Sequence, residues 1–233
     1  MQYLNPYIEL CLEGSLSVFK GLNQKDKEAL AENHSYTIYK RGALIFKEGG
    51  KTRGLICLAS GKVKVFKGGA GGRDQIIKMV KQQGIIGYHT LFTENIHSFS
   101  AAAIEETAIC IFEKNTVLKI LKKNNDLSLK FMKVIAEELG VSNLRTVSLT
   151  QKHIRGRLAE ALLILRDTYG VEADGMTLQV SLPREDIASL SNMTTSNAIR
   201  TLSNFASEGI IELKGRKIII ADSKILEYIS ELG

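Results

Sequence analysis

Residues 182–202 constrain the local fold more strongly than any other stretch of this sequence. Two short amphipathic helical patterns, at 184–191 and 195–207, flank a few polar residues. Pro183 suits the start of the first helix, because the earliest amides of a helix have no intrahelical partner. Asn192 tolerates the left-handed backbone that so short a turn requires. The stretch therefore predicts two helices joined by a tight turn.

The second helical pattern has one apolar and one polar face. Thr194 or Thr195 can cap it. The apolar residues that we expect to be buried on one face are Ala198, Ile199, Leu202, Phe205 and Ala206. The polar residues on or beside the opposite face are Thr195, Ser196, Asn197, Arg200 and Asn204. This arrangement is typical of a helix-turn-helix whose second helix enters the major groove of DNA.

Arg200 is the exposed residue of this helix that can make two hydrogen bonds to a guanine edge. On its own it could equally be a solvated surface arginine, and the surrounding motif favours the base-reading role. After the motif, residues 210–213 and 217–221 flank a basic turn and predict a final hairpin. The basic residues suited to phosphate contacts, which position a protein without reading sequence, are Arg184, Lys214, Arg216 and Lys217.

The first half of the chain is predicted to be a β-structure. From residue 36 to about 113, short apolar runs of four to eight residues alternate with glycine-rich turns. This spacing indicates a small antiparallel barrel or roll. Lys62 to Phe66 alternates lysines with apolar residues, as a strand with one solvated face does.

Residues from about 115 to 150 predict a long helix whose apolar residues lie on several sides. Such a helix needs several packing partners, and a small roll cannot cover all of it. One interpretation is a core helix of a single chain. We favour a helix that also pairs with its twin in a homodimer.

Composition limits the class of protein without deciding its function. The 233 residues, 44% hydrophobic and 24% charged, suit two soluble domains. The sequence shows no apolar run of the ~18 residues that a membrane span needs, and no signal peptide. Its three cysteines are far apart, which suits the reducing cytoplasm. Residues 1–150 carry 21 Lys and Arg against 14 Asp and Glu, a net +7, whereas residues 151–233 carry 10 against 11, a net −1. A nucleic-acid partner must therefore be argued from local geometry.

Several motifs occur in an order that belongs to one known family. They are Arg41-Gly42, Glu48-Gly49, Ser60 to Val65, Gly84 to Gly87, Gly156 to Ala159 and Arg184 to Leu202. In these the chain resembles the cyclic AMP receptor protein and fumarate-nitrate regulator (Crp/Fnr) superfamily of transcription regulators. The resemblance implies an α+β fold: an N-terminal antiparallel β-roll of cyclic-nucleotide-binding type (1–125), a dimerisation helix (126–150) and a C-terminal winged helix-turn-helix (151–233). It also implies a palindromic DNA operator and action through RNA polymerase.

The resemblance assigns roles to individual residues of the second half. Arg200 falls on the family's base-reading arginine, and Thr195 and Ser196 replace the arginine and glutamate that precede it in the cyclic AMP receptor. The residues on or near phosphate-contacting positions are Arg184, Thr194, Asn197 and Arg216. The operator should therefore differ from the receptor's own.

The family's cyclic-nucleotide cassette is altered in this chain. Tyr88 or His89 stands in place of the ribose-binding glutamate, and Phe99 in place of the phosphate-binding arginine. Phe99 offers neither charge nor donor, so a cyclic phosphate would be buried without a matched cation. We expect a sensor that is not a tight cyclic AMP receptor. Its effector-pocket residues would be Gly87, Tyr88, His89, Phe99 and Ser100.

The sequence predicts no metal site and no enzyme. An iron–sulfur cluster uses four thiolates, whereas the chain has only Cys11, Cys57 and Cys110, each expected to be a small buried residue. His89 invites a heme hypothesis, yet a lone histidine is more often a surface or hydrogen-bonded residue. No nucleophile–base constellation is visible. The alternatives are a heme- or redox-sensing regulator of the same fold, and a cyclic-nucleotide-binding-like interaction module without DNA binding.

Overall fold

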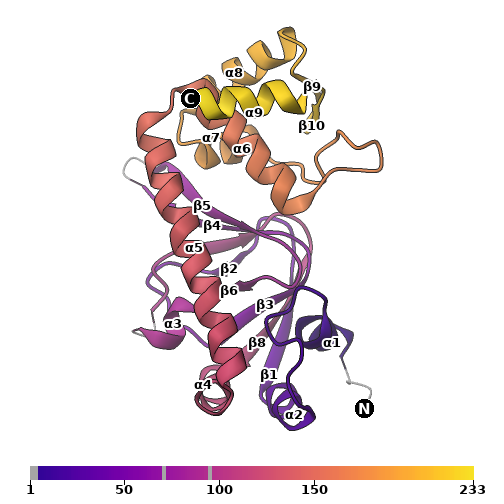
Figure 1. The fold of residues 1–233 in the computed structure, drawn as a ribbon, viewed down its shortest axis with the longest axis vertical. Helices are drawn as coiled ribbons and strands as arrows, with labels where there is room; N and C mark the ends of the chain where they lie inside the picture. Colours follow the sequence, from indigo (N-terminus) through magenta and orange to yellow (C-terminus); the bar gives the residue numbers. More distant parts are fainter. Residues whose placement is uncertain (1–4, 70–71, 94–95) are drawn as a thin grey trace. The chain divides into compact units, whose positions relative to one another are not determined.

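The computed structural model describes residues 5–69, 72–93 and 96–233 (Figure 1). By its internal contacts the chain divides into two compact units. The first consists of Met1–Lys67 and Lys78–Glu138, and the second of Gly68–Ile77 and Leu139–Gly233. Within the described part of the chain, no helix is long and apolar enough to cross a membrane.

Two four-stranded sheets form a β-roll (Figure 1), which belongs to the first unit except for the residues of Gly68–Ile77. One sheet has the order β1 (His34–Tyr39), β8 (Thr107–Glu113), β3 (Gly54–Ser60), β6 (Ile85–Ile86). The other has the order β2 (Leu44–Phe46), β7 (Ser100–Ala103), β4 (Val63–Gly68), β5 (Asp74–Val80). The roll predicted from short strands and glycine turns is confirmed.

Local sequence explains how the roll turns. Gly61, between β3 and β4, has a φ of 87°, and a Cβ there would lie 2.4 Å from the hydroxyl oxygen of Thr107. Only glycine adopts this backbone without cost. In β4, Val63 and Val65 are buried while Lys64 is half-buried, which confirms the predicted alternation.

Four helices pack against the sheet that contains β3 and β8. They are α1 (Pro6–Glu13), α2 (Gln24–Glu32), α3 (His89–Phe92) and α4 (Lys114–Lys123). The core between helices and sheet contains Phe19, whose ring centroid lies 5.1 Å from that of Phe112 and 6.2 Å from that of Phe131. Cys11, Cys57 and Cys110 are buried in the same core, as small apolar residues would be.

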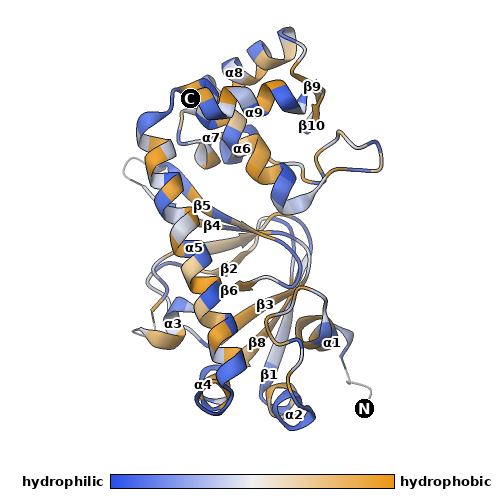
Figure 2. Cartoon of the chain, viewed as in Figure 1, coloured by the Kyte–Doolittle hydropathy of each residue, from blue (hydrophilic) through white to orange (hydrophobic). Residues whose placement is uncertain are grey.

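The predicted long helix is α5 (Asn125–Gln151), with 27 residues and a length of about 40 Å. Polar and apolar residues alternate along it (Figure 2). Leu127 and Phe131 are buried in the core of the first unit that contains Phe19. The exposed apolar residues of α5 are Leu129, Met132, Ile135, Leu139, Val141, Leu144 and Val147. The helix is therefore apolar on more than the side that contacts the roll.

The second unit contains α6 (Ile154–Tyr169), α7 (Arg184–Leu190), α8 (Thr195–Ser207), β9 (Ile211–Lys214), β10 (Lys217–Ile220) and α9 (Ser223–Leu232). The predicted hairpin is β9–β10. No element was predicted after this hairpin, whereas the structure has α9, which packs along α6. The carboxylate of Asp222 accepts a hydrogen bond from the Ile225 amide at 2.9 Å, a helix-capping signal that the sequence contains.

Candidate nucleic-acid interface and sensor site

A tight turn joins α7 to α8. Asn192 in this turn has a φ of 49°, the left-handed region that asparagine tolerates better than most residues. The hydroxyl of Thr194 accepts a hydrogen bond from the Asn197 amide at 3.2 Å. Thr194, and not Thr195, is therefore the N-cap of α8. The predicted pair of helices with its left-handed Asn192 is confirmed.

Packing and an ion pair hold α8 in place. Ala198, Leu202 and Phe205 are fully buried on its inner face. The guanidinium of Arg155 lies 4.8 Å from the centroid of the Phe205 ring. The same guanidinium donates two hydrogen bonds, of 2.7 and 2.6 Å, to the Glu208 carboxylate just after α8. These contacts attach α8 to α6, which carries Arg155.

The predicted burial of Ile199 is wrong, because its side chain is 47% exposed. Ala206 is only partly buried. Thr201 is buried instead, since the inner face of α8 is centred between Ala198 and Phe205 and Thr201 lies on that line. Ile199 is therefore available on the outer face, where an apolar side chain can contact a thymine methyl group. The sequence did not reveal this exposure, because hydropathy alone assigned Ile199 to the core.

Arg200 lies on the same outer face and is exposed. Its guanidinium donates a hydrogen bond to the side-chain oxygen of Asn197 at 3.0 Å. Ser196 is also exposed, whereas Thr195 and Asn197 are half-buried. The hydrogen bond orients Arg200 from one turn earlier in the helix.

Arg184 at the start of α7 supports the hairpin. Its guanidinium donates a hydrogen bond to the carbonyl oxygen of Gly215 at 2.8 Å. Burial lowers the pKa of Arg184 from its usual value. Arg184 therefore holds the turn of the hairpin beside the helix-turn-helix, in addition to any contact it makes with phosphate.

The three basic residues of the hairpin lie in different electrostatic surroundings. Lys217 donates to the Glu172 carboxylate at 2.8 Å, which raises the pKa of Lys217. Lys214 lies 3.7 Å from the carboxylate of Glu212. Arg216, directly after the left-handed Gly215, is exposed at the turn.

The predicted effector-pocket residues of the first unit lie around one aromatic cluster. Gly87, with a φ of 74°, precedes Tyr88. The ring of His89 meets that of Tyr88 edge-on at 6.2 Å and that of Phe99 at 5.9 Å. The hydroxyl of Ser100 accepts a hydrogen bond from the Glu48 amide at 3.0 Å.

Two further aromatic side chains belong to this cluster and were not predicted. His97 is buried, and its ring stacks on that of Phe46 at 3.9 Å. The His89 and His97 rings are 6.3 Å apart. His89 Nε2 and His97 Nδ1 are buried and have no hydrogen-bond partner among the described residues. Burial lowers the pKa of both imidazoles, and His89 lowers that of His97 further.

Glu138 of α5 is the other member that sequence reasoning missed. Its carboxylate accepts hydrogen bonds from the Tyr88 hydroxyl and from the Lys78 ammonium. The Lys78 ammonium also lies 5.5 Å from the centroid of the Tyr88 ring. Burial and the Glu138 carboxylate together raise the pKa of Tyr88. No local pattern could have revealed this network, because Tyr88 and Glu138 are 50 residues apart in the sequence.

The cysteines form a buried group of thiols. The Cys11 thiol points at the carbonyl oxygen of Cys57, with a sulfur–oxygen distance of 3.7 Å, and Cys57 and Cys110 face each other in neighbouring strands. Hydrogen bonding with the Cys11 thiol and burial raise the pKa of Cys110. Over the described ranges, no group of three or more His, Cys, Asp or Glu side chains is arranged to hold a metal ion.

Both units match known sequence families. Residues 36–124 match the cyclic nucleotide-binding domain, and residues 156–229 match the Crp-like helix-turn-helix domain. The CRP-like cAMP-activated global transcriptional regulator of Mycobacterium tuberculosis is 26% identical over 90% of this chain and 94% of its own. The anaerobic regulatory protein of Bacillus subtilis is 28% identical over 81% of this chain and 77% of its own.

Solved structures share the fold. FixK2 from Bradyrhizobium japonicum is similar with a TM-score of 0.74 and 22% identity, over 84% of this chain and 96% of its own. A Crp/Fnr-family transcriptional regulator from Thermus thermophilus has a TM-score of 0.70 and 21% identity, over 84% of this chain and 98% of its own. With a cyclic-nucleotide-binding domain followed by a Crp-like helix-turn-helix, the chain belongs to the Crp/Fnr family of DNA-binding transcription regulators.

Proposed function

We propose that this regulator binds an inverted-repeat operator as a homodimer, with α8 of each protomer in a major groove. The main support for this proposal is the set of side chains on the outer face of α8. There the exposed Arg200 is oriented by Asn197, on a helix that is capped by Thr194 and held by its buried inner face. Arg200 is the main base-reading residue. Thr195 and Ser196 lie one turn earlier, where neighbouring bases are read.

Phosphate contacts position the protein on this operator. The residues proposed to make them are Arg184, Thr194, Asn197, Lys214, Arg216 and Lys217. The exposed apolar residues of α5 support the dimer, because a second copy of the helix would remove them from water. By likeness to the family, the partner beyond DNA is RNA polymerase, in the cytoplasm.

Selection from random-sequence DNA tests this proposal. Two helices related by a two-fold axis enter successive major grooves about 34–36 Å apart. We expect enrichment of palindromes whose half-sites are about one helical turn apart. Enrichment of a single asymmetric half-site, bound by a monomer in sedimentation, would contradict the proposal.

We propose that the sensor unit is not a tight cyclic AMP receptor. A cyclic phosphate out of water needs a matched cation, and Phe99 cannot supply one. Lys78, one candidate cation, is already paired with Glu138. The Mycobacterium tuberculosis relative is described as cAMP-activated, a property that these residues argue against here. Calorimetry with cyclic AMP and cyclic GMP should detect no binding in the low micromolar range, and binding that tight would refute the proposal.

We also propose that one chain holds no iron–sulfur cluster, because it has three thiols and such clusters use four. Iron and acid-labile sulfide analysis after anaerobic purification should find neither in stoichiometric amount. Stoichiometric iron and sulfide would overturn this expectation.

A heme-sensing regulator of the same fold is the second candidate. The unpartnered ring nitrogens of His89 and His97 favour it, because neutral imidazoles are common iron ligands. An absorbance spectrum of protein purified from its own host decides between the candidates. A Soret band that disappears in a His89→Ala variant or a His97→Ala variant would establish this second candidate.

A further inference from the structure

The first unit contains a cavity of about 390 Å³, open to solvent, between the first half of α5 and the turn that connects β5 to β6. This volume lies in the range of small-molecule sites. Its apolar lining includes Val18, Ile85 and Val134. The cassette residues Tyr88, His89 and Phe99 do not line it. The cavity therefore adjoins the aromatic cluster, because Lys78 and Glu138 line it and also contact Tyr88.

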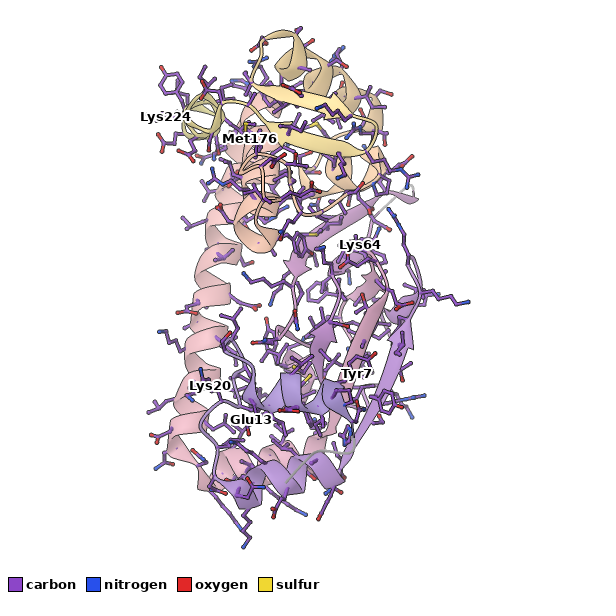
Figure 3. All side chains as sticks on the ribbon, turned by 90° about the vertical axis from the view of Figure 1, so that its right-hand side faces the viewer. Tyr7, Glu13, Lys20, Lys64, Met176 and Lys224 are labelled. Carbon is purple, nitrogen blue, oxygen red and sulfur yellow. The ribbon has the colours of Figure 1, made fainter. Side chains whose placement is uncertain are left out.

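The charged residues that line the cavity are Lys78, Lys130, Lys133, Glu137 and Glu138. Four of these pair with each other: Lys78 with Glu138, and Lys133 with Glu137 at 3.7 Å. The Lys130 ammonium donates to the backbone oxygen of Lys20 at 2.7 Å, and Lys20 is labelled in Figure 3 beside α5. No carboxylate in the described part of the chain pairs with Lys130. The lining thus keeps one uncompensated positive charge.

The backbone at one wall of the cavity is strained. Gln83 has a φ of 67°, which only glycine adopts readily. Its side-chain oxygen accepts a hydrogen bond from the Leu16 amide at 2.6 Å, so Gln83 ties two lining residues together. Strained residues persist where the surroundings hold them, and they concentrate at ligand sites.

We propose that this cavity binds an amphipathic monocarboxylate of medium chain length. The carboxylate lies at the Lys130 ammonium, which then exchanges a backbone oxygen for an anionic partner. The hydrocarbon chain lies against Val18, Ile85 and Val134, where it removes apolar surface from water. A neutral alcohol of the same length gains the apolar contact alone. A short carboxylate gains the charge contact alone.

Calorimetry on the full-length protein tests this assignment, with decanoate and decanol below their aggregation concentrations and with acetate. We expect one decanoate per chain, weaker binding of decanol, and none of acetate. Lys130→Met should weaken decanoate binding about tenfold, as expected for a lost charge-assisted hydrogen bond, and leave decanol binding unchanged. The matched control is Lys122→Met, an exposed lysine of α4, which should bind decanoate like the parent.

Three results would overturn the assignment. They are equal binding of decanoate by the parent and Lys130→Met, binding of decanol as tight as that of decanoate, and no decanoate binding up to millimolar concentration. Val134→Gln adds polarity to the apolar wall and should weaken decanoate and decanol together. Operator binding by ligand-free protein is measured separately, so failure of this proposal leaves the DNA-binding proposal standing.

Discussion

Arg200 and Arg216 differ in what surrounds each guanidinium. Arg200 extends from the outer face of α8 and is oriented by Asn197. Arg216 lies at the turn of a hairpin, after a left-handed glycine. An oriented arginine can read a guanine edge through two hydrogen bonds, whereas an arginine at an exposed turn is suited to a phosphate.

Substitution of the two arginines should therefore give different results. Arg200→Ala should cost about 1–3 kcal/mol on the specific site and flatten the preference for guanine. Arg216→Ala should weaken binding to the specific site and to random DNA about equally. It should also reduce the slope of the logarithm of the binding constant against the logarithm of the salt concentration by about one. Fluorescence anisotropy over a range of salt measures both, with Lys224→Ala on α9 as the control. The reverse pattern would show that α8 is not the reading helix.

The buried pair His89 and His97 should make the stability of the sensor unit depend on pH. Burial lowers the pKa of both imidazoles from the usual 6.5. The unfolded chain therefore binds more protons than the folded chain below about pH 6.5. The stabilisation is complete above that pH and is lost as the pH falls through the lowered values.

Urea unfolding between pH 7.5 and pH 5 should show a free energy of unfolding that decreases as the pH falls. His97→Phe keeps a ring that can stack on Phe46 and removes one titrating group, so it should reduce this pH dependence. If the free energy of unfolding of His97→Phe depended on pH as strongly as that of the parent, His97 would not titrate in this range.

The stability of helix α8 depends on its first turn. The helix begins after Thr194, whose hydroxyl satisfies the Asn197 amide. Without that acceptor the amide has no intrahelical partner. The cap therefore stabilises the turn from which Ser196 and Arg200 extend.

Thr194→Ala should lower the free energy of unfolding of the second unit by about 1 kcal/mol. It should also speed hydrogen exchange at the Asn197 amide. Thr195→Ala is the matched control, because Thr195 is the neighbouring threonine and does not cap the helix. Equal effects of the two substitutions would contradict the assignment of the cap.

The exposed apolar side chains of α5 favour a dimer in which two copies of this helix pair. Met132 and Leu139 lie on one side of it, 56% and 61% exposed, and their spacing of seven residues is that of a coiled-coil seam. Asn143 lies four residues further along the same side. A polar residue at such a position favours one register of paired helices.

Leu139→Lys should break this dimer, because each copy would place a charge in the seam at a cost of several kcal/mol. We expect the dimer dissociation constant in sedimentation equilibrium to rise about 100-fold or more, with operator affinity lost in parallel. Glu137→Lys changes charge on the other side of the same helix and should leave the dimer intact. A Leu139→Lys protein that remains dimeric at low concentration would exclude this face as the interface.

Several elements could be predicted because their signals lie within a few neighbouring residues. Glycine turns predicted the roll, an uninterrupted apolar pattern predicted α5, and Asn192 with its flanking threonines predicted the turn before α8. Each of these depends on backbone preferences within a few residues, which the order of amino acids expresses directly. The capping signal of α9 at Asp222 was equally local and was overlooked.

Contacts between residues of distant segments could not be predicted and are visible in the structure alone. Ile199 lies outside the core because Thr201 occupies the inner face of α8, and both residues suit either side of a helix. His97 stacks on Phe46, and Glu138 joins Tyr88 to Lys78. These contacts depend on how sheets and helices pack against one another. No pattern within a single segment specifies that packing, because each of these side chains finds its partner on another element.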